Sequence, residues 1–127
     1  MDDYLIRIYN ALMDNALIAE QCNGRIKFYD YPETCDVTAP YIVIDPLDAP
    51  LASDYADNDW LTFDYMVQID VWSKRRKTTR DLSYEVMKAL WAINFGQSGG
   101  AGDEYDKDTG IFRMAQRYRG KIYKGEI

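Results

Sequence analysis

Residues 60–72, which read WLTFDYMVQIDVW, decide the fold class of this chain. Apolar side chains occupy every second position between the two tryptophans, and mostly polar side chains fill the positions between them. Because successive side chains of a strand point to opposite faces of a sheet, this alternation predicts a half-buried strand. The apolar face comprises Leu61, Phe63, Tyr65, Val67, Ile69 and Val71, and the wet face comprises Thr62, Asp64, Met66, Gln68 and Asp70.

The length of this strand sets a second expectation. At about 3.3 Å per residue it spans roughly 40 Å, which is well beyond a typical strand. A strand of that length either crosses a whole sheet or projects past it as one arm of a hairpin.

Four shorter strands are expected around it. Residues 40–46 begin and end in proline, which limits the strand, and three consecutive β-branched residues predict burial on both faces. The other strands are expected at residues 25–29, 111–118 and 121–123, with a turn at Arg119-Gly120 between the last two.

Two segments have the period of an amphipathic helix. The first covers residues 2–20 and ends before Asn23-Gly24. The second begins at Thr78 or Thr79 as cap, with Asp81 as the capping-box partner of Thr78, and continues to Phe95 before Gly96 ends it. The apolar stripes are Leu5, Ile8 and Leu12, continued by Ala16 and Ala19, in the first helix, and Leu82, Val86, Ala89, Leu90 and Ile93 in the second.

The order helix, three strands, helix, two strands predicts a single α+β domain over residues 1–127. We expect a two-layer arrangement in which two helices pack on a mostly antiparallel sheet of about four to five strands. Residues 47–59 are expected to form an acidic loop. Residues 94–110, rich in Gly and Asp, are expected to form a mobile loop.

Charge and composition exclude several classes of function. The net charge of −6 argues against a dedicated nucleic-acid binder and against attachment to anionic lipid, because both need a basic surface. The sequence has no run of eighteen apolar residues, so no membrane span is expected. The N-terminus lacks the basic and apolar regions of a signal peptide, which favours folding in the cytoplasm of the producing cell with Cys22 and Cys35 as free thiols.

We expect no cofactor, no metal and no catalytic site. The chain contains no histidine, which removes Ser-His-Asp and Cys-His systems and most zinc sites. Residues 96–102 read GQSGGAG, but the Lys-Ser/Thr of a phosphate loop is missing. Asp64 and Asp70 lie roughly 20 Å apart along the strand, too far for an acid/base pair. The acidic residues Asp103, Glu104, Asp106 and Asp108 match part of the spacing of a calcium-binding loop. The glycine and the bidentate glutamate of such a loop are missing.

Segments of opposite charge are the candidates for contacts with partners. The basic run 74–77 is expected to be solvated, as charged turns usually are. If it has a function, we expect it to contact the acidic segment 48–59 of another copy of the chain. Separate positive and negative patches suit head-to-tail association that closes into a ring. The wet face of the long strand is the first place to look for ring contacts. The candidate contact residues are Asp48, Asp54, Tyr55, Asp57, Asp59, Thr62, Asp64, Met66, Gln68, Lys74, Arg75, Arg76 and Lys77.

The order of short motifs resembles a known family. The expected N-terminal helix is followed by KFYDYPE at 27–33, APYIVIDP at 39–46 and FDYMVQIDVWSK at 63–74, and then by a capped helix. This order is similar to that of the small tail-completion and tail-terminator proteins of long-tailed bacteriophages, a group that includes head–tail joining proteins. The resemblance extends from about residue 2 to residue 123. It implies structural roles for Pro40, Tyr41, Asp70, Trp72 and Ser73.

This resemblance implies a non-enzymatic structural protein of the virion, located at the tail end or the head–tail neck. Such proteins form a hexameric ring on the tail tube, end its polymerisation and join the tail to the head connector, and some are monomeric until assembly. The implied partners are other copies of the chain, the tail-tube protein and the head-completion or connector protein. DNA is expected to pass through the channel without specific binding, and assembly is expected in the cytoplasm of the bacterial host. Residues 47–59 and 96–110 correspond to places where ring neighbours are contacted.

Two other classes of function stay open at this point. An acidic binding module that mimics DNA is motivated by the five acidic residues between 45 and 59, and it would bind a basic host protein. A small carboxylate-dependent enzyme is less favoured, because the chain lacks histidine and a converging pair of acids.

Overall fold

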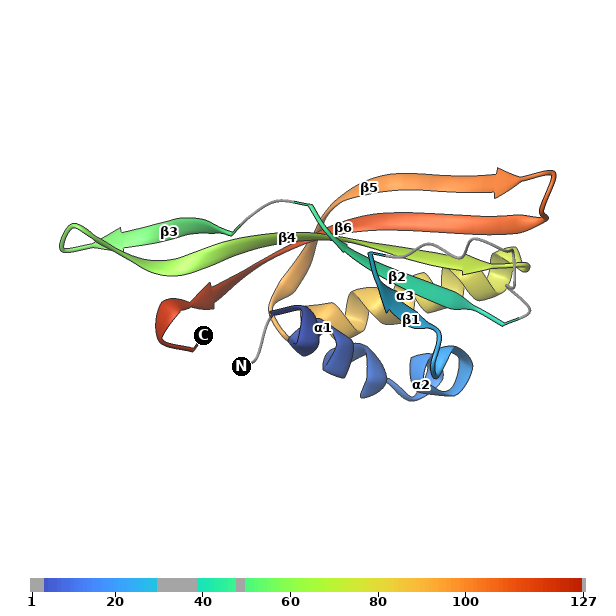
Figure 1. The fold of residues 1–127 in the computed structure, drawn as a ribbon, viewed down its shortest axis with the longest axis horizontal. Coiled ribbons are helices and arrows are strands. Elements are labelled where there is room, and N and C mark those ends of the chain that lie inside the picture. Colours follow the sequence, from blue (N-terminus) through green and yellow to red (C-terminus); the bar gives the residue numbers. More distant parts are fainter. Residues whose placement is uncertain (1–3, 30–38, 48–49, 127) are drawn as a thin grey trace.

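The computed structural model describes residues 4–29, 39–47 and 50–126. Within these residues three α-helices and six strands form two layers, and all three helices lie on one face of the sheet (Figure 1). The elements are α1 (Tyr4–Met13), α2 (Ala16–Cys22), β1 (Ile26–Phe28), β2 (Tyr41–Pro46), β3 (Leu51–Ala56), β4 (Asp59–Ser73), α3 (Arg76–Trp91), β5 (Phe95–Asp106), β6 (Ile111–Tyr123) and a 3-10 turn (Lys124–Glu126). The predicted α+β class is confirmed, with six strands and three helices in place of four to five strands and two helices.

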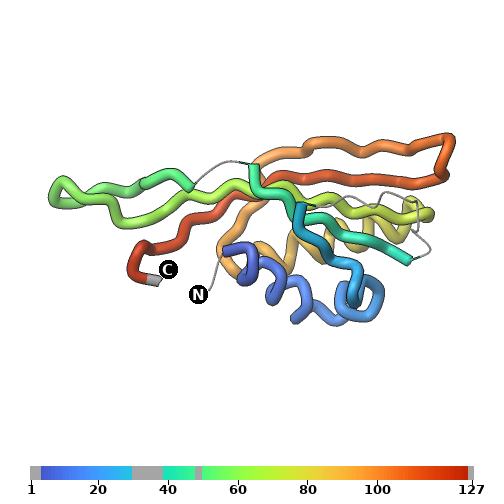
Figure 2. The backbone as a smooth tube through the Cα atoms, in the orientation of Figure 1, coloured from blue at the N-terminus to red at the C-terminus, as the bar shows by residue number. Residues whose placement is uncertain are grey.

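The sheet is open and almost entirely antiparallel. Its order is β1-β2-β4-β6-β5, and β3 also pairs with β4. Among the described strands only β1 and β2 run parallel. The predicted long strand is β4, which is central because it pairs with β2, β3 and β6. As Figure 2 shows, the backbone of β3 and the start of β4 continue beyond the helical layer at one end of the molecule.

One hydrophobic core lies between the sheet and the helices. The predicted apolar face of β4 supplies Val67, Ile69 and Val71, each no more than 1% exposed. The predicted burial of β2 on both faces is also confirmed, because Ile42, Val43 and Ile44 have no exposed surface. The remaining fully buried large side chains are Ile8, Leu12, Ile18, Leu82, Leu90, Phe95 and Tyr118.

The N-terminal helical segment is broken, which corrects the single helix expected over residues 2–20. Helix α1 ends at Met13, and Asn15 caps α2 by accepting a hydrogen bond from the backbone N–H of Ile18 at 3.1 Å. An asparagine in this role satisfies a free N–H at the helix start, and the chain changes direction there. The buried residues of α2 are accordingly Ile18 and Cys22, in place of the expected Ala16 and Ala19.

The acidic loop expected at 47–59 is also corrected. Its described part contains β3, which forms a hairpin with β4 through a turn at Asp57 and Asn58. Both turn residues have positive φ, 51° and 62°, which is the geometry of a tight type I′ hairpin turn. Asp and Asn tolerate this conformation better than other residues with a side chain.

The loop expected at 94–110 is wrong for most of its length, because residues 95–106 form β5. This strand pairs with β6 along its whole length, with irregularities between Gln97 and Gly99 and between Gly100 and Gly102. Helix α3 ends at Trp91, and the left-handed residue after it is Asn94 (φ 68°), so Gly96 is not its terminator. Backbone hydrogen bonds hold β5 in place, which explains why its side chains show no apolar period.

The two C-terminal strands expected at 111–118 and 121–123 are one strand, β6. Gly120, expected in a turn, lies inside this strand opposite Tyr65 and Phe95. A Cβ atom at Gly120 would lie 2.6 Å from the Phe95 ring. The glycine is therefore explained by the close approach of an aromatic ring.

Candidate assembly surfaces

The hairpin of β3 and β4 forms an arm at one end of the molecule (Figure 1). This agrees with the expectation that the long strand projects past the sheet as one arm of a hairpin. Strand β6 pairs with β4 only from Thr62 onward, so residues 59–61 of β4 pair with β3 alone among the described strands. A two-stranded ribbon is marginally stable by itself, which makes this arm a candidate for cover by another molecule.

The arm carries apolar side chains that reach solvent. Leu51 is 63% exposed, Tyr55 is 72% exposed and Trp60 is 37% exposed. Trp60 packs edge-on against Phe63 with a centroid distance of 6.0 Å, and the Lys124 ammonium lies 4.5 Å from the centre of its ring. Apolar and aromatic side chains grouped on a protruding ribbon are typical of a protein-contact surface.

The acidic residues of the arm differ in their partners. Asp54 accepts hydrogen bonds from the Thr62 hydroxyl at 2.7 Å and from Lys121 at 3.0 Å, and these two bonds hold the pKa of Asp54 below its usual value. Asp59 is paired with Lys124 at 2.6 Å, which lowers the pKa of Asp59. Asp57 has no ion-pair partner among the described residues. Asp48, the remaining candidate in this segment, lies outside them.

The face of the sheet without helices is the second surface, and part of it is not wet as expected. Gln68 is 8% exposed and Asp70 is fully buried. Asp70 accepts hydrogen bonds from the Arg113 Nε at 2.9 Å and from the Gln68 side-chain amide at 3.0 Å. Arg113 also contacts Glu104 at 3.2 Å and lies over the Trp72 ring at 5.9 Å. Side chains from β5 and β6 therefore cover residues that sequence alternation assigned to solvent.

The outer part of this face is more open. Asp64 forms an ion pair with Arg119 at 3.5 Å, and Met66 is half-buried with its backbone carbonyl accepting from the Leu47 N–H. Arg117 is exposed, and its Nε donates a long hydrogen bond of 3.5 Å to the side-chain amide oxygen of Gln68. Arg113 and Arg117 were not among the contact residues predicted from the sequence. Both arginines lie on one face of the expected strand 111–118, and this shared face could have identified them. Their proximity to Asp70, however, follows only from the pairing of β6 with β4.

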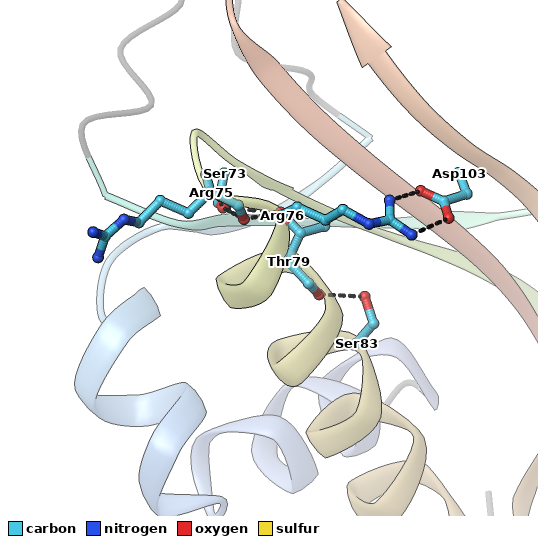
Figure 3. A network of polar contacts seen from close by, with 6 residues as sticks. All are labelled: Ser73, Arg75, Arg76, Thr79, Ser83 and Asp103. Atoms are coloured by element: carbon cyan, nitrogen blue, oxygen red, sulfur yellow. Dashed lines mark hydrogen bonds and ion pairs between the residues drawn. The ribbon is translucent and has the colours of Figure 1, made fainter.

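The basic run 74–77 is the third surface, at the junction of β4 and α3. Figure 3 shows that Arg76 and Arg75 extend in opposite directions from this junction. Arg76 forms two parallel hydrogen bonds with Asp103, at 3.1 and 3.2 Å, and these bonds raise the pKa of Arg76. Lys77 pairs with Asp81 at 2.7 Å. The described residues supply no carboxylate to Lys74 or to the Arg75 side chain.

The start of α3 differs from the expected capping box. The helix begins at Arg76, and Arg75 occupies the cap position without a side-chain cap bond. The Ser73 hydroxyl accepts from the Arg75 N–H at 3.0 Å, and the Thr79 hydroxyl donates to the Arg75 carbonyl at 3.0 Å. Ser73 and Thr79 are buried, so these bonds fix the backbone at the point where β4 becomes α3 (Figure 3).

Two shallow grooves lie beside this junction, and Arg75 lines both. One has a volume of about 480 Å³ and is bordered by Pro40 and Lys74. The other has a volume of about 340 Å³ and is bordered by Leu17, Thr78 and other residues of α2 and α3. An exposed arginine between two grooves can contact both a carboxylate and an aromatic ring of a partner.

The segments considered for chemistry have structural roles in the described part of the chain. The GQSGGAG sequence lies in β5, so it is no phosphate loop. Asp103 and Glu104 bind arginines, and no group of three or more described residues has the arrangement of a metal site. Burial raises the pKa of the Cys22 thiol to about 12, while Cys35 lies outside the described residues. None of the described helices is long and apolar enough to cross a membrane.

The protruding arm and the basic junction expose apolar, aromatic and charged side chains of the kinds found at protein-contact surfaces. The sequence profile of the family described as tail completion protein gp17 matches residues 6–123, and the chain belongs to this family. It is therefore a structural protein of a phage-type tail and not an enzyme. The family resemblance inferred from the short motifs is confirmed.

A solved structure supports the same fold. A chain in the structure described as "Virion of native gene transfer agent (GTA) particle" superposes with a TM-score of 0.67 and covers 91% of each chain at 12% identity. No curated protein sequence matches this chain significantly.

Proposed function

We propose that the protein forms a hexameric ring at the end of the tail tube, ends polymerisation of the tube and joins the tail to the head connector. In this role its partners are other copies of itself, the tail-tube protein and a head-completion or connector protein. The protein is incorporated into the virion after assembly in the cytoplasm of the bacterial host. We place this ring at the tail end or in the neck between head and tail.

The observation that carries the proposal is the arm of β3 and β4. Among the described strands, residues 59–61 at its tip pair with β3 alone, and the arm exposes Leu51, Tyr55 and Trp60 to solvent. A second layer supplied by a neighbouring subunit buries these side chains and completes the ribbon, and each buried apolar group then contributes to association. A ring gives every subunit such a neighbour, because a head-to-tail contact repeats until it closes.

The net charge of −6 agrees with a channel through which DNA slides. A channel wall that binds phosphate strongly would retain the DNA, whereas an acidic subunit gives weak affinity. We expect fluorescence anisotropy with duplex DNA to show no strong binding at physiological salt, and tight, salt-sensitive binding would contradict this part of the proposal.

The alternative of a DNA-mimicking inhibitor receives less support from the arm. Such a protein presents a row of free carboxylates to its partner. Asp54 and Asp59 are instead paired with Lys121 and Lys124, so within residues 50–60 only Asp57 has an unpaired carboxylate. A pull-down that recovers a basic host protein in place of tail components would reverse this preference.

The test uses the chain together with the tail-tube protein of the same particle. Electron microscopy of tubes assembled with and without the chain measures tube length, and capped tubes of limited length with rings at one end are the expected result. The variant Leu51→Ser/Tyr55→Ser removes the exposed apolar groups of the arm and is expected to abolish capping while the thermal unfolding temperature stays close to that of the wild type.

The matched control is Tyr105→Ser. Tyr105 is 53% exposed on the other hairpin, where it stacks on Phe112 at 4.5 Å, and its loss is expected to leave capping intact. Tubes of unlimited length in the presence of the wild-type chain, without rings at their ends, would refute the proposed function.

A further inference from the structure

Two segments of opposite charge lie at opposite ends of the molecule. Residues 50–60 contain three acidic residues and no basic one, and residues 74–80 contain five basic residues and no acidic one. Figure 1 shows the turn between β3 and β4 at one end of the longest axis and the junction of β4 with α3 at the other. A subunit with such poles attracts a second copy in a head-to-tail orientation, which is the arrangement that a ring requires.

The groups available for such a contact are few, because most charges of both segments are already paired within the chain. At the arm, Asp54 and Asp59 bind lysines, which leaves Asp57 at the tip of the turn. At the junction, Arg76 and Lys77 bind carboxylates, whereas Lys74 and the Arg75 side chain have none among the described residues.

The two ends also differ in shape. The arm is a narrow ribbon, and Tyr55, which is 72% exposed, lies two residues before Asp57. The junction has a groove on each side of Arg75, with volumes of about 480 and 340 Å³, and their borders include Pro40 and Leu17. A tyrosine ring placed in such a groove contacts apolar side chains and the guanidinium plane together.

We infer that the tip of the arm of one subunit docks beside Arg75 of the next subunit, with Tyr55 in a groove and Asp57 paired with Arg75. This inference rests on the proposed ring and names its subunit contact. The occupant of the junction grooves is therefore a second copy of this chain. The contact is heterologous, so each subunit uses its arm once and its junction once.

A charge-swap experiment tests the contact without disturbing the turn. Asp57→Asn keeps a residue that tolerates the positive φ of 51°, and Ala56→Lys adds a positive charge at the exposed end of β3. Arg75→Glu places an acid at the start of α3, where the helix dipole favours it. The arm variant changes the charge by about +2 and the junction variant by about −2, so the combination restores the original balance.

Sedimentation velocity over a range of protein and salt concentrations, with the tube-capping assay beside it, provides the readout. Ala56→Lys/Asp57→Asn and Arg75→Glu are each expected to raise the concentration at which oligomers form by about tenfold, because each places like charges opposite one another. The triple variant is expected to recover assembly. The control Lys27→Glu changes the charge at an exposed position of β1, which lies at neither end of the molecule (Figure 1), and is expected to leave assembly at the wild-type level.

The outcomes separate this contact from the proposed function. If the wild type forms rings that cap tubes and the three charge variants all behave like it, the contact is refuted and the proposed ring stands. If both separate variants fail and the triple variant fails equally, the direct pairing of Asp57 with Arg75 is also refuted. If the wild type neither self-associates nor caps tubes, the ring itself is refuted and this contact with it.

Discussion

Replacement of Arg113 by methionine tests whether the buried polar network holds the sheet together. The Asp70 side chain is 1% exposed, and Arg113 supplies its charged partner at 2.9 Å. Methionine keeps an apolar stem of similar length but leaves the Asp70 carboxylate with the neutral Gln68 amide as its remaining donor. Removing one partner of a buried ion pair costs about 3–5 kcal/mol. Because the hydrogen bond from the Gln68 amide remains, we expect a loss of about 3 kcal/mol.

The expected loss is large enough to measure by thermal and urea denaturation. For a chain of this size 1 kcal/mol corresponds to roughly 4 °C, so Arg113→Met is expected to lower the unfolding temperature by about 12 °C. Asp70→Asn in the same chain removes the uncompensated charge. The double variant is therefore expected to recover about 2 kcal/mol relative to Arg113→Met alone.

The control lies on the same strand and the same face. Arg119 is 53% exposed, and its ion pair with Asp64 has a length of 3.5 Å. Exposed pairs contribute about 0–1 kcal/mol, so Arg119→Met is expected to change the unfolding temperature by a few degrees at most. If Arg113→Met loses no more stability than Arg119→Met, or if Asp70→Asn fails to rescue it, Asp70 does not depend on Arg113 in the way the structure indicates.

Three further expectations follow from individual residues. Gly120→Ala is expected to cost about 1–3 kcal/mol because its Cβ would lie 2.6 Å from the Phe95 ring, and Phe95→Leu in the same chain should reduce that cost; equal costs in both backgrounds would contradict the packing argument. The Cys22 thiol, with its pKa raised to about 12 by burial, is expected to resist alkylation in the native protein at neutral pH, as peptide mapping by mass spectrometry can show, and rapid labelling without unfolding would contradict this. The hydrogen bond from the Thr62 hydroxyl is the main cause that lowers the pKa of Asp54 below the ordinary value of 3.8. The carboxylate of Asp54 therefore stabilises the hairpin fully above pH 3.8, and this stabilisation is lost as the pH falls through the lower pKa of the folded state. A pKa at or above 3.8 in an NMR titration of the Asp54 carboxyl would contradict this expectation.

The sequence determined the features that depend on local periodicity. Alternation over residues 60–72 predicted β4 and its buried face, and the prolines around residues 41–45 predicted the short buried strand β2. The stripe Leu5, Ile8, Leu12 predicted the buried side of α1. These predictions succeeded because one buried face forces apolar residues to recur with the period of the element.

The tertiary structure decided the features that depend on pairing between distant segments. Strand β5 is held by backbone bonds to β6, which no side-chain pattern within residues 95–106 records. The alternation predicted that Asp70 is a solvated residue on the outer face of the sheet. In the folded chain it is buried beside Arg113 of β6, which lies 43 residues further along the sequence. The charges of the arm were visible in the sequence, but only folding shows which of them are paired within the subunit. The positions of most helices and strands and their apolar faces could thus be predicted from the sequence, because they follow from local periodicity. Which polar residues are buried and which charges are unpaired depends on contacts between distant segments, and a local pattern does not contain that information.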